Sequence, residues 1–463
     1  MGCGASAVEL CGFELAAEEA AAHVIEGFPT PIPDDRFSVT CEDRDGGLEF
    51  NFADRRVVIN PDKTCQDDLM DIDSYPDKRR LHLIRNVCDS LELRNRGNDG
   101  WSIVFFKTIR NFRAGQPEPL PDRSVSAVKE KIKVVSGTKE DIPALVELSY
   151  YVFRYSYLEY FTPDYFAAMM DNPYHVFHVA KTESGRVVAF QNYAVEPEMT
   201  TEICYYYDIM THPYYRNSLV MLKFAKKIAV DLNNPPHPDV RLWFLELIAT
   251  HIHSQRYAAD FDFTICGIKP SHDVVVQYTG DIESIDQRET YLLAWHWLVK
   301  YHGGIIRFYS VPEHADIIRR IFSLQEMNGQ ICTAEFVSAA EFHVTVKVEA
   351  GDGTLTITFE HFAADENAFA LLLRHKKEEA MDTGLKTVYV RIPAWVPLPE
   401  YISAGMKGNG FFFTGIEPRN ASEIYILYCC LCAQNFDFDK VKVCDPYSLE
   451  LLSYVKNEYM MVN

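Results

Sequence analysis

The chain has 463 residues, too many for one hydrophobic core, so we expect about three domains of ordinary size. Its composition, with 48% hydrophobic and 24% charged residues, is that of a folded globular protein without a disordered tail. A net charge of -21 would repel both a nucleic-acid backbone and an anionic membrane, so neither partner is expected.

The N-terminus lacks the basic and then apolar order of a secretory signal. No apolar run approaches the roughly 20 residues that cross a bilayer, so we expect a cytoplasmic protein. Residues 1–6 fit the N-myristoylation pattern, but an acidic segment follows where stable anchoring needs a basic one. The sequence leaves open whether Gly2 is modified.

Twelve cysteines are scattered along the chain, and one pair, Cys429 and Cys432, has CxxC spacing. A zinc site would need a second such pair. Together with Cys430, these residues continue the apolar run 424–428, and neighbours on a strand point to opposite faces. We therefore predict reduced thiols packed in the core and no metal site.

Alternating prolines mark the clearest boundary, at residues 114–122, because they forbid helix and withhold ladder donors. We place a first domain at residues 1–113 and a Pro-rich linker at 114–131. A second domain follows at 132–310 and a third at 311–463.

The second domain begins with a strand at 133–135 and a helix that a capping box at 138–141 introduces. The next predicted elements are an antiparallel hairpin of 176–180 with 187–190, and a third strand at 204–210. After Pro213 the apolar positions take helical spacing over 221–232. The run 240–245 is then apolar enough for a strand covered on both faces.

The third domain contains a second predicted hairpin, 344–348 with 355–359, and a helix from Asp365 that Gly384 can cap. A strand follows at 387–390. The Phe-x-x-x-Gly stretch at 411–415 matches another at 263–267, each roughly 25 residues after a buried strand, which indicates a degenerate internal repeat. The third domain could complete the sheet of the second or form a dimer surface.

The element order in 132–310, and the stretch Met-Thr-His-Pro-Tyr-Tyr-Arg at 210–216 directly before a helix, resemble the GNAT superfamily of acyl-CoA N-acyltransferases. The resemblance implies an α/β (α+β) fold whose mixed sheet opens between the strand ending near Thr211 and the strand 240–248. Pantetheine would lie in this wedge. Backbone N–H groups at the helix N-terminus would hold the pyrophosphate.

In this family the loop reads Arg-x-x-Gly-x-Gly or Ala, because glycine lets the backbone approach phosphate. Here Arg216 is present, whereas Leu219 and Met221 fill the small positions and would crowd the pyrophosphate. Helix N–H groups do not depend on side chains, so an anion site can remain. The resemblance assigns acetyl-CoA binding to Ile209, Met210, Thr211, Arg216, Asn217, Ser218, Leu219, Val220 and Met221.

The stretch 246–256 resembles the strand-to-helix turn of the GNAT branch that is fused to an anti-sigma-factor-like ATPase module. Where this region usually supplies a tyrosine acid, the chain has Ala258, with Tyr257 one place earlier. Acetyl transfer needs a base for the ammonium proton and an acid for the thiolate. The candidates are Glu246, a lone carboxylate in an apolar strand whose pKa burial could raise, and His253 or Tyr257.

Structural roles are the alternative for these residues. Glu246 could be a strand-end residue at the solvent rim, and His251 and His253 could be loop residues hydrogen-bonded to backbone.

The first domain resembles the C-terminal part of the histidine-kinase-like ATPase sandwich of anti-sigma-factor kinases. The matching pieces are Glu19-x-x-x-His23, Asp54, and residues 81–85 followed by 90–93. Active members have an asparagine magnesium ligand at the position of His23 and glycines where this chain has Arg55 and the run 78–80. Magnesium prefers hard oxygen ligands, so we expect a truncated sandwich without ATP hydrolysis or kinase activity.

Two functions remain open. One is an N-acyltransferase that moves an acetyl or acyl group from acyl-CoA to an amine of a small molecule or protein. The other is an inactive regulator that senses a ligand or binds a protein partner. Loss of glycines at both sites favours the regulator, whereas Arg216 and the acidic surface suit an enzyme with a cationic amine substrate. A homodimer is compatible with either.

Overall fold

The computed structural model describes residues 5–26, 37–44, 46–54, 76–97, 100–110, 131–154, 156–161, 163–216, 218–276, 278, 282 and 284–462. Gly2, Asn217 and almost all of the Pro-rich linker therefore lie outside the described residues. The chain divides into two compact units, residues 1–119 and 120–463, which we describe separately. No helix within the described ranges is long and apolar enough to span a bilayer.

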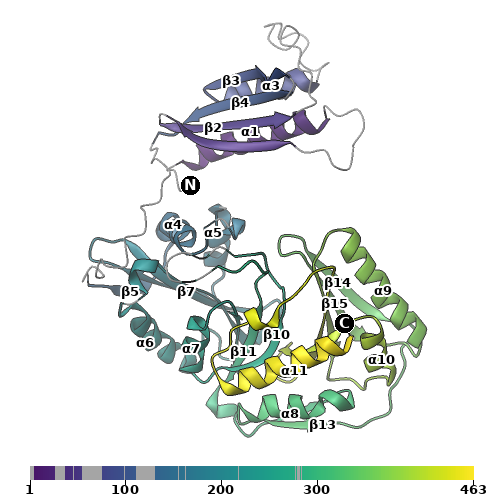
Figure 1. The fold of residues 1–463 in the computed structure, drawn as a ribbon. Coiled ribbons are helices and arrows are strands. Elements are labelled where there is room, and N and C mark those ends of the chain that lie inside the picture. The colour runs from purple at the N-terminus through teal and green to yellow at the C-terminus, as the bar shows by residue number, and fades with distance from the viewer. Residues whose placement is uncertain are drawn as a thin grey trace. The chain divides into compact units, whose positions relative to one another are not determined.

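The N-terminal unit is an antiparallel sheet in the order β1-β2-β4-β3, on which the described helices α1 and α3 pack (Figure 1). Small and apolar side chains make this packing possible, because Ala16 and Ala20 of α1 are buried with Ile84 of α3 against Phe105 of β4. Its elements are α1 (Ala7–Glu26), β1 (Ser38–Arg44), β2 (Gly47–Asp54), α3 (Pro76–Val87), β3 (Ser90–Asn95) and β4 (Trp101–Thr108).

The first half of the second unit has the predicted order of strand, helices, three antiparallel strands, helix, buried strand, helix and strand. The capping box at Thr138 is present. The elements are β5 (Lys133–Ser136), α4 (Ile142–Phe153), α5 (Pro163–Asp171), β6 (His175–Lys181), β7 (Val187–Glu196), β8 (Thr200–Thr211), α6 (Val220–Asn233), β9 (Leu242–Ile248), α7 (His253–Ala259), β10 (Thr264–Lys269) and β11 (Tyr291–Trp297).

The second half confirms the predicted hairpin, and Gly384 ends the long helix with a φ of 78°. The elements are β12 (Ile305–Phe308), α8 (Ala315–Ser323), β13 (Asn328–Ile331), β14 (His343–Glu349), β15 (Thr354–His361), α9 (Glu366–Asp382), β16 (Thr387–Pro393), α10 (Tyr401–Gly408), β17 (Phe412–Pro418), β18 (Ile424–Leu431) and α11 (Pro446–Val462).

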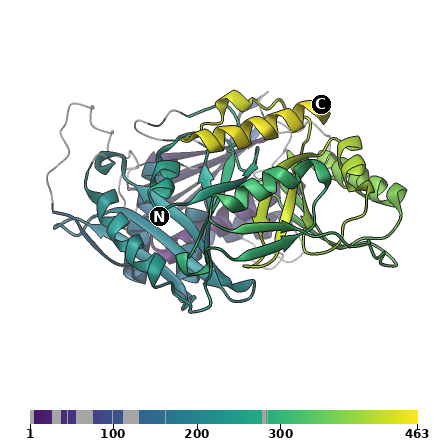
Figure 2. The same cartoon turned by 90° about the horizontal axis from the view of Figure 1, so that it is seen from below.

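One 12-stranded sheet joins the two halves, in the order β14-β15-β16-β18-β17-β10-β11-β9-β8-β7-β6-β5. The C-terminal part therefore completes the sheet of the preceding part, which was one of the two expected roles. The C-terminal helix α11 packs on β17 and β10, one strand from each half (Figures 1 and 2). The domain boundary at residue 310 stays a prediction. Cys429, Cys430 and Cys432 lie in the shared core, as the sequence predicts.

The internal repeat is confirmed by the strand order. Strands β7-β8-β9-β11-β10 have the same sequence of antiparallel and parallel pairings as β14-β15-β16-β18-β17. The halves meet where Gly267 of β10 pairs with Gly415 of β17, and each strand has a register shift directly before its glycine. The two Phe-x-x-x-Gly stretches thus mark a pseudo-twofold axis at the centre of the sheet.

A side chain at this crossing should destabilise the protein. A Cβ on Gly415 would lie 2.3 Å from the Cα of Gly267, and the φ of 130° at Gly415 is unfavourable for other residues. We expect Gly415→Ala to lower the free energy of unfolding by about 2–3 kcal/mol, measured by urea denaturation. Gly351→Ala is the control, because a Cβ there would have no neighbour within 4 Å. Equal stability of the two variants would contradict the close approach.

Candidate functional site

The predicted wedge between β8 and β9 is confirmed. The two strands pair in parallel over four residues each, ending at Tyr206 and Leu245. Both strands then continue, to Thr211 and Ile248, without further pairing to each other. The second half has no such opening at this position. There β15 and β16 stay paired through Arg391, whereas the equivalent residue of β9 is the first one beyond the opening.

A β-bulge in β8 lies at the start of the wedge. The register with β7 shifts between Gln191 and Tyr193, so that Tyr207 and Asp208 stand opposite Asn192. The Asp208 backbone N–H donates to Asn192 Oδ1 at 2.7 Å. Because a bulge increases the local twist, it turns the end of β8 away from β9.

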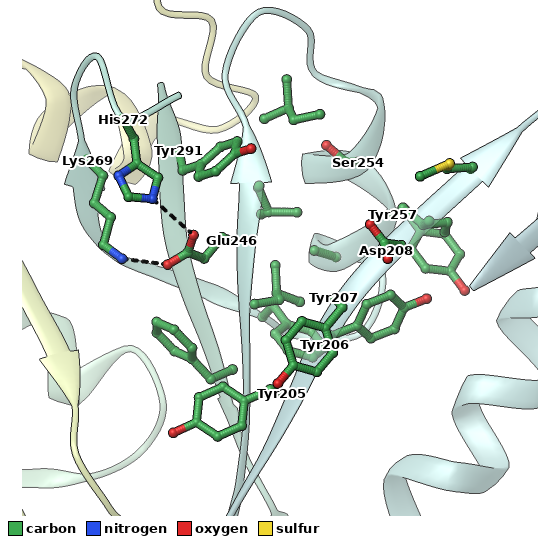
Figure 3. A pocket seen from close by; sticks show the side chains of 18 of the residues that line it. Tyr205, Tyr206, Tyr207, Asp208, Glu246, Ser254, Tyr257, Lys269, His272 and Tyr291 are labelled. Atoms are coloured by element: carbon green, nitrogen blue, oxygen red, sulfur yellow. Dashed lines mark hydrogen bonds and ion pairs between the residues drawn. The ribbon is translucent and has the colours of Figure 1, made fainter. Parts of the chain in front are cut away.

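A cavity of about 800 Å³ occupies the wedge (Figure 3). One wall is formed by β8 and the start of α6, the other by β9, and α7 lies beside both. Five of the predicted acetyl-CoA residues line it: Ile209, Met210, Thr211, Arg216 and Met221.

The remaining described residues of the predicted acetyl-CoA site lie outside this lining. Leu219 is 67% exposed and Val220 is buried, while Ser218 bonds the backbone of its own turn. Met221 does face the cavity, and its sulfur accepts a hydrogen bond from Thr211 Oγ1 at 3.3 Å. Of the two large side chains that replace the family's small residues, Met221 alone narrows the cavity.

Asp208 is a cavity residue that the sequence did not single out. Its Oδ1 accepts a hydrogen bond from Tyr160 Oη at 2.7 Å, and its Oδ2 is buried with no hydrogen-bond partner among the described residues. Burial raises its pKa to about 6, although the Tyr160 hydrogen bond opposes this. The sequence signal would have been a lone carboxylate directly before the predicted acetyl-CoA residues 209–211.

Glu246 is not the lone carboxylate that the sequence suggested. Its Oε1 lies 2.6 Å from Lys269 Nζ, and its Oε2 lies 3.9 Å from His272 Nε2 (Figure 3). Lys269 belongs to β10, and helix α7 lies between β9 and β10 in the sequence. Glu246 lines the cavity at the first position of β9 after the strands separate, not at an outer rim.

Tyr257 of α7 also lines the cavity, and its hydroxyl donates to Gln191 Oε1 at 3.3 Å. Burial raises the pKa of Tyr257, so this phenol stays protonated at neutral pH. His253 is the exposed first residue of α7, and its backbone N–H donates to His251 Nδ1 at 3.3 Å. Both histidines line the cavity, and His251 makes the expected backbone contact.

A buried carboxylate fixes the turn that leads into α7. Glu289 accepts hydrogen bonds from Thr250 Oγ1 at 2.7 Å and from Tyr278 Oη at 2.6 Å. Its other oxygen accepts from the backbone of Ala249 and Thr250. Glu289 therefore holds the turn between β9 and α7, and with it the position of Tyr257.

The two candidate proton carriers approach the wedge from different faces of the sheet. Tyr257 belongs to α7 and bonds Gln191, to which Tyr206 also donates. Asp208 instead bonds Tyr160, from the 3-10 helix Leu158–Phe161 between α4 and α5. A reaction in the wedge would thus have a phenol on one side and a carboxylate on the other.

In the N-terminal unit, the residues of the predicted degenerate ATP site are Glu19, His23 and Asp54. His23 and Asp54 are buried, and Glu19 lies 3.5 Å from Arg80 of the cationic run. Loss of ATP hydrolysis stays a prediction.

No protein-family model and no curated protein matches the chain. Solved structures with a similar arrangement are N-acetyltransferases. The ribosomal-protein-S18-alanine N-acetyltransferase from Escherichia coli shares 15% identity over 36% of this chain and 94% of its own, with a TM-score of 0.29. An N-acetyltransferase from Staphylococcus aureus Mu50 shares 15% identity over 36% of this chain and 99% of its own, with a TM-score of 0.29.

Spermidine N-acetyltransferase from Vibrio cholerae, solved with CoA and spermine, gives 8% identity over 37% of this chain and 97% of its own, with a TM-score of 0.28. Likenesses of this size concern part of the chain and carry no statement about its activity.

Proposed function

We propose that the second unit is an acyl-CoA-dependent N-acyltransferase. The observation that carries the proposal is the opening between β8 and β9, where a buried carboxylate of raised pKa and a protonated phenol flank one cavity. The acyl-pantetheine arm would lie in the wedge with its thioester beside the bulge. The acceptor amine would enter from the side of α4 and α5.

Asp208 is the proposed general base. A carboxylate with a pKa of about 6 is largely ionised at neutral pH and is still basic enough to take a proton from an ammonium ion, directly or through water. Its buried Oδ2 has no hydrogen-bond partner among the described residues, so the carboxylate has an oxygen that can hold this proton. Glu246, paired with Lys269, would face the cationic amine from the opposite strand.

The reaction then balances with Tyr257 as the general acid. The amine nitrogen forms a bond to the thioester carbonyl carbon, and the carbon–sulfur bond breaks. Asp208 takes one proton of the ammonium ion, and the CoA thiolate receives the proton of Tyr257. The nitrogen gives up its second proton as the amide forms, and this proton passes through water to the Tyr257 phenolate. Because the phenol and the carboxylate lie on different faces of the sheet, the CoA sulfur would meet Tyr257 and the amine would meet Asp208.

The pyrophosphate of CoA would lie at the N-terminus of α6, beside Arg216, because helix N–H groups and a guanidinium both attract a dianion. Ile209, Met210 and Thr211 would line the pantetheine arm. Titration of the full-length protein with acetyl-CoA, followed by an assay for CoA release with amines, tests the proposal. Failure to bind acetyl-CoA would contradict it, and binding without turnover would favour the regulator.

Met221 allows a sharper test of this binding site. We expect Met221→Ala to tighten acetyl-CoA binding about threefold or more, since the side chain narrows the cavity and alanine preserves the helix. Leu219→Ala is the matched control and should leave affinity unchanged, because this side chain points to solvent. Arg216→Ala should weaken binding about tenfold. Calorimetry measures the acetyl-CoA affinity of all three variants. If the substitution of Leu219 has the same effect as that of Met221, the ligand binds elsewhere.

A further inference from the structure

The cavity continues from the wedge onto the second half of the sheet. Beyond Glu246 and Lys269, its lining includes Glu417, Arg391 and Tyr389. In the first half, Val152 and Phe153 of α4 line the cavity. Residues 332–342, between β13 and β14, contain no helix, and the floor of this part of the cavity is formed by side chains of β10, β16 and β17.

A chain of four charges crosses this floor. Lys269 Nζ lies 2.6 Å from Glu246 Oε1 and 3.6 Å from Glu417 Oε1, which accepts from Arg391 Nη2 at 2.8 Å. The side chains of Lys269 and Glu417 in the middle are 9% and 10% exposed. Those of Glu246 and Arg391 at the ends are 32% and 29% exposed. The cavity therefore has one accessible negative and one accessible positive end.

The pseudo-twofold axis relates these two ends. In the sheet, Glu246 is the pairing partner of Leu293, which in turn pairs with Gly267. In the same way, Arg391 pairs with Leu427, which in turn pairs with Gly415. The two halves thus place opposite charges at equivalent positions.

Arg391 has hydrogen-bonding capacity that the protein does not use. Its Nε and Nη2 donate to Glu417 at 2.7 and 2.8 Å. Its Nη1 has no hydrogen-bond partner within the described part of the chain, although a guanidinium has five N–H groups. A second carboxylate can therefore bind the free edge in the planar geometry that arginine favours.

We propose that Arg391 binds a carboxylate of the acceptor, so that the acceptor is a small molecule with both an amine and a carboxylate. This inference rests on the proposed function and names the substrate class of the same site. The amine lies at the Glu246 end, beside the wedge. Lys269 does not compete for the carboxylate, because it is enclosed between Glu246 and Glu417.

The spacing agrees with such a molecule. Contacts of 2.6, 3.6 and 2.8 Å in series place Glu246 Oε1 and Arg391 Nη2 within about 9 Å of each other. An amino acid with a side-chain amine, or a dipeptide, has this reach, since each extended residue spans about 3.3–3.6 Å.

The test compares amines that differ by a carboxylate alone: L-lysine with cadaverine, L-ornithine with putrescine, and 6-aminohexanoate with pentylamine. Binding to the full-length protein with saturating CoA is followed by ligand-observed NMR, and acetyl transfer by CoA release. We expect at least one carboxylate member to bind tenfold or more tighter than its partner. Partners that bind equally, amines that bind better, or no binding of any pair at 20 mM would each overturn the proposal.

The variant that tests Arg391 removes both members of its ion pair. Arg391→Met/Glu417→Leu leaves the pair of Glu246 with Lys269 intact, so net charge and folding are preserved. The carboxylate preference should fall below about twofold, whereas acetyl-CoA affinity should not change. A preference that persists in this variant overturns the assignment. Absence of acetyl-CoA binding to the wild-type protein would instead contradict the proposed function. The two failures are distinguishable, because ligand-observed NMR measures the carboxylate preference without turnover.

Discussion

Asp208→Asn should lower kcat/KM for N-acetylation by about 10²- to 10⁴-fold, the usual contribution of a general base. Acetyl-CoA affinity should be unchanged, because asparagine has the same shape and can still accept the Tyr160 hydrogen bond. Steady-state kinetics and calorimetry on the same preparation measure both quantities. Asp239→Asn is the control, since Asp239 is an exposed carboxylate that bonds Thr201 away from the cavity.

The pH dependence of kcat/KM for the wild-type protein should follow the ionisation of Asp208. Because the ionised carboxylate acts as the base, kcat/KM should rise as pH rises through about 6, the pKa of Asp208. The Asn variant should lack this limb of the profile. A profile with the limb intact after substitution would assign the base to another group.

A stability measurement separates this role from a structural one. The folded pKa of Asp208 is raised by burial above its ordinary value of 3.8, so its contribution to stability is present below that value and is lost as pH rises through about 6. The ionised group therefore costs on the order of 2–3 kcal/mol at pH 7. Asp208→Asn should raise the Tm at pH 7 while activity falls. A variant that loses both activity and stability would indicate a structural role.

Sequence patterns predicted the parts of this site that depend on local order. Apolar runs and turn residues located the three antiparallel strands, the crossover helix and the buried strand, and these fix where the sheet opens. The two Phe-x-x-x-Gly stretches indicated the repeat, because each lies roughly 25 residues after a buried strand. Gly267 and Gly415 are indeed the residues that pair across the axis.

The ionic contacts and the bulge could not be predicted in this way. Lys269 and Glu417 each follow their repeat glycine by two residues, but nothing in the sequence shows that the two strands are neighbours. Arg391 and Glu246 lie 145 positions apart in the chain and share one cavity only through six aligned strands. The bulge at Asp208 is a difference of one residue in register, which no periodicity reveals. Glu246 was therefore interpreted without its partner.

Glu417→Leu should be the most destabilising substitution in the charge chain, lowering the free energy of unfolding by about 3–5 kcal/mol. Glu417 is buried and accepts two hydrogen bonds from Arg391, with Lys269 at 3.6 Å. Its removal leaves the Arg391 guanidinium in the sheet without a counter-ion. Burial alone would raise the pKa of Glu417, but Arg391 and Lys269 lower it to about 2. Its contribution to stability is therefore present above its ordinary value of 4.5 and is lost as pH falls through about 2.

A double-mutant cycle tests whether charge balance is the cause. Arg391→Met/Glu417→Leu removes one cation and one anion and leaves Glu246 paired with Lys269, so no buried charge remains unpaired. The double variant should thus be more stable than Glu417→Leu alone, because deleting a whole buried ion pair costs much less than deleting one partner. Urea denaturation at pH 7 measures all four corners, and a constant m-value would show that the unfolded states are comparable. If the two substitutions instead destabilise additively, Glu417 and Arg391 act independently, and the four residues do not form one balanced chain across the pseudo-twofold axis.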